Sequence, residues 1–412
     1  MTYPDSFTLH WTGGPLCGTA QLPASKSESN RVLILQALAG GGTLENLSEA
    51  NDTQLMRRLL ADADATEINA EDAGTVMRFL TAYLAVTGRN VTLTGTPRML
   101  ERPIGILVDA LRQLGAVIDY EGREGYPPLR LRGWQPVESA PLQVRGDVSS
   151  QFISALMMIG PLVPGGLHLQ LTGHIGSRPY IQMTAELMRH FGAEVEVHER
   201  DVRVSERPYL PADYHVESDW SAASYWYSLV ALAPTGSQVR LPGLRRQSLQ
   251  GDQVVRHLME SLGVRTEFED EGVTLYQMPA ESRSSRVAMN FTDCPDLAQT
   301  IAVAAAATGV VVDMTGLESL RIKETDRIAA LQTELAKFGA ALKPTVDDVF
   351  QVTANDFEVR EQHVATYHDH RMAMAFAPLA FRGRLTVEKP VVVRKSYPFF
   401  WEELRQAGFD LQ

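Results

Sequence analysis

The sequence of 412 residues lacks most of the features that mark secreted, membrane or disulfide-rich proteins. It contains two cysteines, Cys17 and Cys294, too few for a disulfide framework or a cysteine-based zinc site. Its first residues show no basic stretch followed by an apolar one, so no secretory signal is expected. Apolar runs such as residues 301–312 are shorter than the roughly 18 residues that a membrane span needs. These absences predict a soluble cytoplasmic protein without a membrane partner.

Positive charge is also scarce, since 38 Lys and Arg stand against 50 Asp and Glu and give a formal net charge of -12. Non-specific binding to nucleic acid needs a basic face, so this composition argues against a nucleic-acid partner. P-loop, nucleophile-elbow, Cys-x-x-Cys and dinucleotide-binding glycine motifs are absent as well. The basic residues instead recur in short polar runs, which favours a small, multiply anionic substrate held in a cationic cleft.

The chain does contain an internal repeat. An amphipathic helix that ends in Leu/Phe-Gly-Ala/Val precedes two alternating strands at residues 107–131, 183–204, 254–276 and 328–352. The helix-ending glycines, expected in the left-handed conformation, are Gly115, Gly192, Gly263, Gly339 and Gly408. A degenerate sixth copy without the glycine fits residues 54–68. A more uniformly apolar, buried helix is expected with each copy, over residues 29–39, 75–87, 150–159, 221–233, 296–308 and 371–381.

Six such copies indicate one repeat architecture rather than six domains. Dividing them three and three places a boundary near Glu217, in agreement with the two domains that the length suggests.

Three helix starts in the first half share polar or glycine-containing runs: residues 25–31, 73–78 and 146–151. Backbone N–H groups at a helix N-terminus favour anions, and Lys26, Arg31 and Arg78 add positive charge. The alternative is ordinary helix capping, with Thr75 as a cap, beside solvated charges. If the repeats pack about a common axis, these helix starts would converge on one anion.

The second half holds the acid–base candidates. Asp296 stands in the run Asp293-Cys294-Pro295-Asp296, where simple capping is the alternative role. Residues 323–327 combine two cations and two acids, and on a helix Lys323 and Arg327 would share one face; a solvated helix start is the alternative. Residues 367–371 alternate His and Asp, but they offer no third ligand at recognisable spacing and end in a cation, so no metal site is expected. Glu318 and Asp369 are interpreted as structural or supporting acids.

Together these runs resemble the family of 5-enolpyruvylshikimate-3-phosphate (EPSP) synthases, the 3-phosphoshikimate 1-carboxyvinyltransferases. The matching runs, in family order between residues 22 and 398, are LPASKSESNR, AGTVMRFL, PRMLERPIG, VSSQF, SRPYI, DCPD, RIKETDR, HDHRMAM and RKSYP. The resemblance implies an α/β (α+β) fold, a two-domain inverse α/β barrel of six βαβαββ-type repeats, three per domain, with the active site in the interdomain cleft. It implies a shikimate-phosphate-side domain over 18–217 and a second domain, carrying the acid and base, over 1–17 plus 218–412.

The resemblance further implies that the enolpyruvyl group of phosphoenolpyruvate is transferred to the 5-hydroxyl of shikimate 3-phosphate, releasing phosphate, in the shikimate pathway to chorismate and aromatic amino acids. It implies a monomer without metal or organic cofactor, and a target of glyphosate. The implied shikimate 3-phosphate ligands are Lys26, Ser27, Arg31, Ser149, Ser150, Gln151, Ser177, Tyr180, Asp296, Ser319 and Lys323. The implied phosphoenolpyruvate ligands are Lys26, Gly74, Arg102, Gln151, Arg327, His370, Arg371 and Lys395. Lys26 and Lys323 join the catalytic set, with Asp296 as acceptor of the hydroxyl proton and Glu324 as proton donor to the methylene carbon.

Three positions depart from the family pattern: Asp72 replaces the usual Asn, Phe79 the usual Pro, and Ser319 a substrate-contacting Asn. One alternative is the transferase that acts on UDP-N-acetylglucosamine, whose loop cysteine matches neither Cys17 nor Cys294. Another is a non-catalytic phosphometabolite-binding protein, against which the presence of Lys26, Asp296, Lys323 and Glu324 argues. A turnover assay with both substrates separates these readings.

Overall fold

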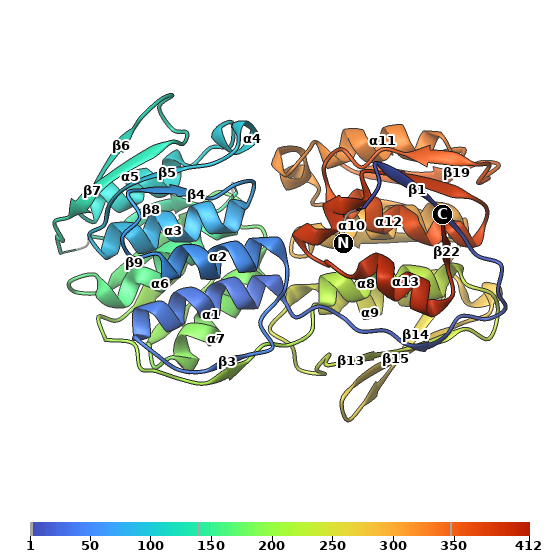
Figure 1. Cartoon of the computed structure of the whole chain (residues 1–412), viewed down its shortest axis with the longest axis horizontal. Coiled ribbons are helices and arrows are strands. Elements are labelled where there is room, and N and C mark those ends of the chain that lie inside the picture. The colour runs from blue at the N-terminus through green and yellow to red at the C-terminus, as the bar shows by residue number, and fades with distance from the viewer. Residues whose placement is uncertain (1–2, 139, 148, 347) are drawn as a thin grey trace. The chain divides into compact units, whose positions relative to one another are not determined.

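The computed structural model describes residues 3–138, 140–147, 149–346 and 348–412, which divide into two compact units. Unit 1 comprises the chain up to Ala24 together with Glu217–Gln412, and unit 2 comprises Ser25–Val216. Figure 1 shows unit 2 in blue to green, whereas unit 1 contains both ends of the chain. Within the described part of the chain, no helix has the length and apolar character needed to cross a membrane.

Unit 2 is built from helices and three sheets. Its helices are α1 (Lys26–Ala39), α2 (Asn51–Ala61), α3 (Gly74–Val86), α4 (Pro97–Leu100), α5 (Gly105–Gln113), α6 (Ser150–Ile159) and α7 (Arg178–His190). Its strands are β3 (Leu44–Glu45), β4 (Glu67–Asn69), β5 (Asn90–Thr94), β6 (Ala116–Tyr120), β7 (Leu129–Trp134), β8 (Leu142–Arg145), β9 (Leu167–Thr172), β10 (Val195–Val197), β11 (Asp201–Val204) and β12 (Tyr214–His215). Helix α3 packs against α6, and α6 against α7, inside the unit.

Unit 1 is likewise built from helices and sheets. Its helices are α8 (Trp220–Leu232), α9 (Val255–Leu258), α10 (Ala298–Thr308), α11 (Arg327–Ala336), α12 (His370–Phe376) and α13 (Phe400–Ala407). Its strands are β1 (Ser6–His10), β2 (Cys17–Thr19), β13 (Gln238–Pro242), β14 (Val264–Glu269), β15 (Gly272–Gln277), β16 (Arg286–Asn290), β17 (Val311–Thr315), β18 (Ala340–Pro344), β19 (Phe350–Ala354), β20 (Gln362–Val364), β21 (Leu385–Glu388) and β22 (Asp410–Leu411). The alanine-rich helix α10 packs closely against both α8 and α12.

One strand pattern recurs in both units. Among the described residues, five sheets have four strands, in the orders β4-β5-β7-β6, β10-β11-β9-β8, β14-β15-β13-β2, β16-β17-β19-β18 and β20-β21-β1-β22. In each, one edge strand is parallel to its neighbour and the remaining pairings are antiparallel, as in β4, β5, β7 and β6. The parallel pair β12–β3 forms a reduced sixth sheet. This arrangement confirms the predicted fold class of repeated βαβαββ-type units.

The first strands of the chain complete sheets made mostly from the C-terminal half. Strand β1 lies between β21 and β22, where it supplies the third strand of the last sheet. Strand β2 pairs in parallel with β13, with Gly18 opposite Val239. Residues 18–24 therefore pack in unit 1, whereas the sequence placed the start of the other domain at residue 18.

The predicted apolar helices form close to their expected limits, with differences at some ends. Helix α10 begins at Ala298 because a 3₁₀ turn, Pro295–Leu297, precedes it. Helix α12 ends at Phe376 and continues as a 3₁₀ segment, Ala377–Phe381, where Pro378 cannot donate a helical hydrogen bond. The helix expected after residue 254 is divided among the 3₁₀ turn Gly251–Val254, α9 and the 3₁₀ turn Met259–Leu262.

The five helix-ending glycines all adopt the predicted left-handed conformation. Their φ angles are 99° at Gly115, 86° at Gly192, 90° at Gly263, 75° at Gly339 and 109° at Gly408. At Gly115 a Cβ atom would overlap the carbonyl oxygen of Gln135, whose N–H donates to the Gly115 carbonyl at 2.9 Å. Glycine is needed there both for its φ and for this close approach.

We predict that Gly115→Ala lowers the free energy of unfolding by about 2 kcal/mol or more, because left-handed strain adds to the overlap with Gln135. The matched control is Gly88→Ala, at φ 68° with no atom within 4 Å of the added Cβ, which should cost only about 1 kcal/mol. Denaturant unfolding of both variants measures the difference. Equal losses would show that the close approach to Gln135 contributes nothing.

Candidate active site

Unit 1 gathers carboxylates from three segments around Arg327, the first residue of α11. The Arg327 side chain is only 2% exposed. Its Nε donates to Asp369 Oδ2 at 2.7 Å, Nη1 to Asp296 Oδ1 at 3.0 Å and Nη2 to Glu324 Oε2 at 2.9 Å. Asp326 caps α11 by accepting from the N–H groups of Ile328 and Ala329, each at 3.1 Å. This cap makes Arg327 the first helical residue and sets the direction from which its guanidinium meets the three acids.

Two further cations share these acids. Arg371 Nη2 lies 2.8 Å from Asp296 Oδ2, and Lys395 Nζ lies 3.3 Å from Glu324 Oε1. Both acids remain partly accessible, with side-chain exposures of 20% for Asp296 and 16% for Glu324. Burial by itself would raise the pKa of Asp296, but the charges of Arg371, Lys323 and Arg327 outweigh burial and hold this pKa well below its usual range.

Asp296 and Lys323 have different structural roles from those that the sequence suggested, whereas Asp369 has the supporting role that was expected. Asp296 lies in the 3₁₀ turn before α10, whose N-cap, Leu297, makes no side-chain capping bond, so Asp296 is an ion-pair partner and not a cap. Lys323 ends the 3₁₀ turn Glu318–Ile322, which contains Ser319, and therefore does not lie on a helix with Arg327. Asp369 both pairs with Arg327 and caps α12, with its Oδ1 accepting from the Arg371 N–H at 2.8 Å.

Residues 367–371 alternate His and Asp, and the sequence predicts no metal site there. In the structure His370 is the first residue of α12 and is buried beside Asp369. The described residues contain no group of three or more His, Cys, Asp or Glu positioned to hold a metal ion.

Unit 2 places Arg31 at the centre of a second polar group. Its Nε donates to Thr184 Oγ1 at 2.8 Å, Nη1 to the Ser27 carbonyl at 2.9 Å and Nη2 to Ser154 Oγ at 3.1 Å. The guanidinium carbon lies 5.3 Å from the ring centroid of Phe79 and 5.7 Å from that of Tyr180, within the range of cation–π attraction. Burial lowers the pKa of Arg31 to about 10, so the group is still cationic at neutral pH.

The starts of α3 and α6 lie next to each other, as two of the three predicted helix starts should. Gln151 Nε2 donates to Thr75 Oγ1 at 3.0 Å, and Ser149 caps α6 by accepting from the Gln151 N–H at 3.3 Å. Thr75 is therefore not a cap, since Ala73 occupies the N-cap position of α3 without a side-chain capping bond. Val148, in the run before α6, lies outside the described residues.

Gly74 opens α3 against two guanidinium groups. A Cβ at this position would lie 2.5 Å from Nη1 of Arg78 and 2.8 Å from Nη1 of Arg102. Arg78 is held there because its Nη1 donates to the Gly74 carbonyl at 2.9 Å. The carboxylate of Asp72, which adds negative charge near this helix start, accepts a hydrogen bond from the Thr96 hydroxyl. A side chain larger than glycine would therefore displace positive charge at this helix start.

The remaining predicted residues lie on the starts of α1, α6 and α7. Lys26 is the first residue of α1 and lies 3.2 Å from Asp52 Oδ2, in the first turn of α2. Ser150 begins α6. Ser177 precedes α7 with a left-handed φ of 56°, and Tyr180 is in the first turn of that helix.

Sequence reasoning missed the groups that hold these cations in place. Thr184 and Ser154 are buried hydroxyls inside α7 and α6, where nothing in the sequence separates them from ordinary core residues. Asp52 had a visible signal, since an acid in the first turn of a helix is typical of N-terminal stabilisation, but its pairing with Lys26 is not local.

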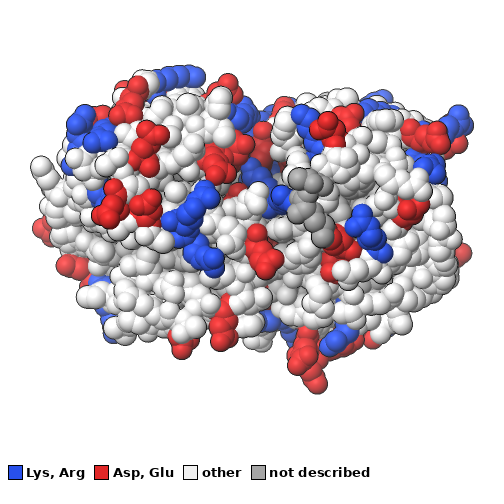
Figure 2. Space-filling model, in the orientation of Figure 1, with Lys and Arg blue, Asp and Glu red and all other residues white. Residues whose placement is uncertain are grey.

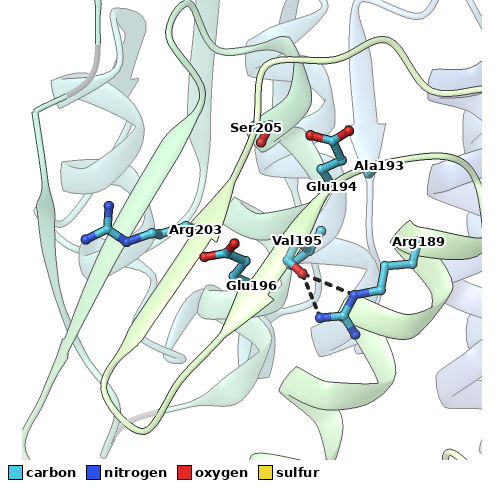
Figure 3. A pocket seen from close by; sticks show the side chains of 7 residues that line it. All are labelled: Arg189, Ala193, Glu194, Val195, Glu196, Arg203 and Ser205. Atoms are coloured by element: carbon cyan, nitrogen blue, oxygen red, sulfur yellow. Dashed lines mark hydrogen bonds between the residues drawn. The ribbon is translucent and has the colours of Figure 1, made fainter.

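A hollow of about 510 Å³ on unit 2 is lined by other residues, drawn in Figure 3. There Arg189 donates twice to the Val195 carbonyl, at 3.1 Å from Nε and 2.6 Å from Nη2. Arg112 likewise donates two hydrogen bonds to the Ile118 carbonyl, at 3.0 and 2.7 Å, so the same structural arrangement occurs in two copies of the repeat. On the face of each unit shown in Figure 2, side chains of both charge signs are interspersed.

Partly accessible carboxylates with a strongly shifted pKa, held among several cations, mark a candidate functional site of an enzyme, and the cations suit a small anionic ligand. The family model for EPSP synthase (3-phosphoshikimate 1-carboxyvinyltransferase) matches residues 57–404. The chain is 47% identical over 398 residues to the 3-phosphoshikimate 1-carboxyvinyltransferase of Bacteroides fragilis, with 96% of each protein covered. It is 39% identical over 416 residues to that of Paraburkholderia phytofirmans, with 93% of this chain and 95% of the relative covered.

A solved structure of EPSP synthase from Acinetobacter baumannii has the same fold, with a TM-score of 0.81 at 21% identity, covering 99% of this chain and 100% of that one. The chain belongs to the EPSP synthase family, as its motifs predicted.

One buried acid beside this site has an unusual titration. Asp252, in the 3₁₀ turn Gly251–Val254, accepts from the Ser221 hydroxyl through Oδ2, and its Oδ1 has no hydrogen-bond partner within the described part of the chain. Burial, followed by the negative charge of Asp296, raises the pKa of Asp252 to about 7. Between roughly pH 4 and this value the Asp252 carboxyl therefore binds its proton more tightly in the folded protein than in the unfolded chain, and its contribution to stability falls as the pH rises.

We predict that Asp252→Asn removes this pH-dependent loss, because the amide keeps the shape of the carboxyl and carries no charge. The free energy of unfolding of the variant minus that of the wild type should be larger at about pH 8 than at about pH 5. Thermal unfolding of both proteins across this range measures the effect. A difference that stays constant with pH would mean that the Asp252 carboxyl titrates normally.

Proposed function

We propose that this chain transfers the enolpyruvyl group of phosphoenolpyruvate to the 5-hydroxyl of shikimate 3-phosphate, releasing phosphate, as a cytoplasmic monomer in the shikimate pathway. Membership of the EPSP synthase family supports this proposal. The observation that carries it is the arrangement of Asp296 and Glu324 on two sides of the buried Arg327 guanidinium. Transfer requires one proton to leave the hydroxyl and another to reach a carbon, and two separate carboxyl groups can perform these steps.

In the proposed reaction the hydroxyl oxygen attacks C2 of phosphoenolpyruvate while Asp296 accepts the hydroxyl proton. Glu324 protonates C3, which gives a tetrahedral adduct. Glu324 then takes a proton back from C3 while the C2–O bond to phosphate breaks, which restores the double bond, and the proton on Asp296 passes to the departing phosphate or to solvent. The reaction is redox-neutral and so needs no redox cofactor. We propose that it also uses no metal ion or other organic cofactor, because side-chain cations can stabilise the charge on the phosphate.

The cations bind the substrates and stabilise charge on the departing phosphate. We assign phosphoenolpyruvate to Lys26, Gly74, Arg102, Gln151, Arg327, His370, Arg371 and Lys395. We assign shikimate 3-phosphate to Lys26, Ser27, Arg31, Ser149, Ser150, Gln151, Ser177, Tyr180, Asp296, Ser319 and Lys323.

The ion pairs of unit 1 suggest how the base becomes reactive. A carboxylate held by Arg327 and Arg371 is a weak base, because both cations favour its ionised form. We propose that the carboxylate and phosphate of phosphoenolpyruvate compete for these cations and for Lys395. Once the anionic substrate shares their charge, the pKa of Asp296 rises toward the range in which it can accept a proton.

We expect phosphate release to require both substrates and to persist in excess chelator. Omitting either substrate, or offering UDP-N-acetylglucosamine as the acceptor instead, should abolish the signal. Turnover with the nucleotide sugar would favour the related transferase, and binding without turnover would favour a non-catalytic protein. Loss of activity in chelator with recovery on adding a divalent ion would contradict the cofactor-free reaction.

We expect Asp296→Asn and Glu324→Gln each to lower kcat by about 10²–10⁴-fold, because each removes a proton-transferring group while keeping its shape. For Asp296→Asn the Kd of phosphoenolpyruvate should stay the same or decrease, since the amide no longer competes for Arg371. The matched control is Asp313→Asn, which removes an Asp–Arg pair of 2.7 Å to the exposed Arg286 and should leave kcat unchanged. Near-normal turnover in either test variant would refute its assigned role.

A further inference from the structure

The segment before α12 makes a turn that is costly for its residues. Tyr367 and His368 have left-handed φ angles of 53° and 57°, and the Asp369 N–H donates to the Thr366 carbonyl at 2.8 Å. These are the features of a type I′ turn, whose two central positions normally hold Gly, Asn or Asp. A tyrosine followed by a histidine is strained in this conformation, so contacts outside the turn must hold it.

Helix α11 supplies those contacts on both sides of the turn. The buried Glu334 accepts from the Ala365 N–H, just before the turn, at 3.3 Å and from the hydroxyl of Tyr367, in the turn, at 2.8 Å. After the turn, Arg327 holds Asp369 at 2.7 Å. Arg327 and Glu334 are seven residues apart, which places them two turns apart on one face of the helix. Lys337, also bound to Glu334 at 2.7 Å, donates to the His363 carbonyl at 2.8 Å.

We infer that Glu334 and the Tyr367 hydroxyl are positioning groups that keep the strained turn closed and thereby place Asp369 and Arg371 in the charged centre. Asp369 depends on the turn because its N–H closes it, and Arg371 depends on Asp369, which accepts from the Arg371 N–H at 2.8 Å. Arg371 in turn holds Asp296. The link to turnover rests on the proposed function, whereas the link to the turn's geometry does not.

The test variant is Tyr367→Phe, which keeps the ring and removes only the hydroxyl, with its bond to Glu334 and its contact with Thr333 on the same helix. We expect kcat to fall about tenfold or more, because displacing a positioned group by a fraction of an ångström impairs catalysis. Amide hydrogen exchange in residues 365–372 should become about tenfold faster, since the turn opens more often. The matched control is Tyr3→Phe, which removes a hydroxyl bond of 2.7 Å to Glu402 in the same unit and should change neither quantity.

A second substitution separates positioning from general loss of packing. Glycine adopts left-handed φ without strain, so His368→Gly should allow the turn to close without the Glu334 bond. We therefore expect the double variant Tyr367→Phe/His368→Gly to recover most of the lost turnover and of the lost exchange protection.

Unchanged exchange in Tyr367→Phe, or a double variant that recovers neither quantity, overturns the inference. If the wild type shows no turnover with the two substrates, the proposed function fails. The exchange measurements still decide whether Glu334 and Tyr367 hold the turn.

Discussion

The charged centre of unit 1 depends on one buried guanidinium, that of Arg327. Three carboxylates, from Asp296, Glu324 and Asp369, lie within 3.0 Å of its nitrogens. Acids so close together would repel one another strongly without a cation, and breaking a buried pair typically costs about 3–5 kcal/mol. The Asp326 cap fixes where α11 begins, so a local feature of the helix decides where these distant segments meet.

Local sequence features of this kind also explain how much of the fold could be predicted. Left-handed glycines such as Gly115 and Gly339 ended the predicted helices because glycine alone tolerates that φ without cost. The parts that could not be predicted depend on pairing between distant segments. The third position of the last sheet is taken by β1, more than 370 residues before its partner β21 at Leu9↔Leu385, and no periodicity within either strand encodes that pairing.

The candidate site shows a similar division. Lys26, Arg31 and Arg327 were identifiable from the sequence because cations beside hydroxyls and acids at helix starts suit anion binding. The hydroxyl partners of Arg31 were not, because Thr184 looks like a core residue in the sequence and becomes a hydrogen-bond acceptor only when α7 packs beside α1. Thr75 was misassigned for the same reason, since its partner Gln151 comes from another helix.

These pairings also bear on the proposed reaction, in which Asp296 and Glu324 exchange protons and the cations that hold them bind substrate. A buried carboxylate or cation without a partner costs desolvation energy, and unpaired cations would repel one another, so leaving either group unpaired would destabilise the fold. The same pairing keeps Asp296 a weak base until an anion competes for Arg371 and Arg327. In the proposed reaction, binding of phosphoenolpyruvate and activation of the base are thus one electrostatic event. Proton transfer would then follow from the presence of the substrate, without a separate switch.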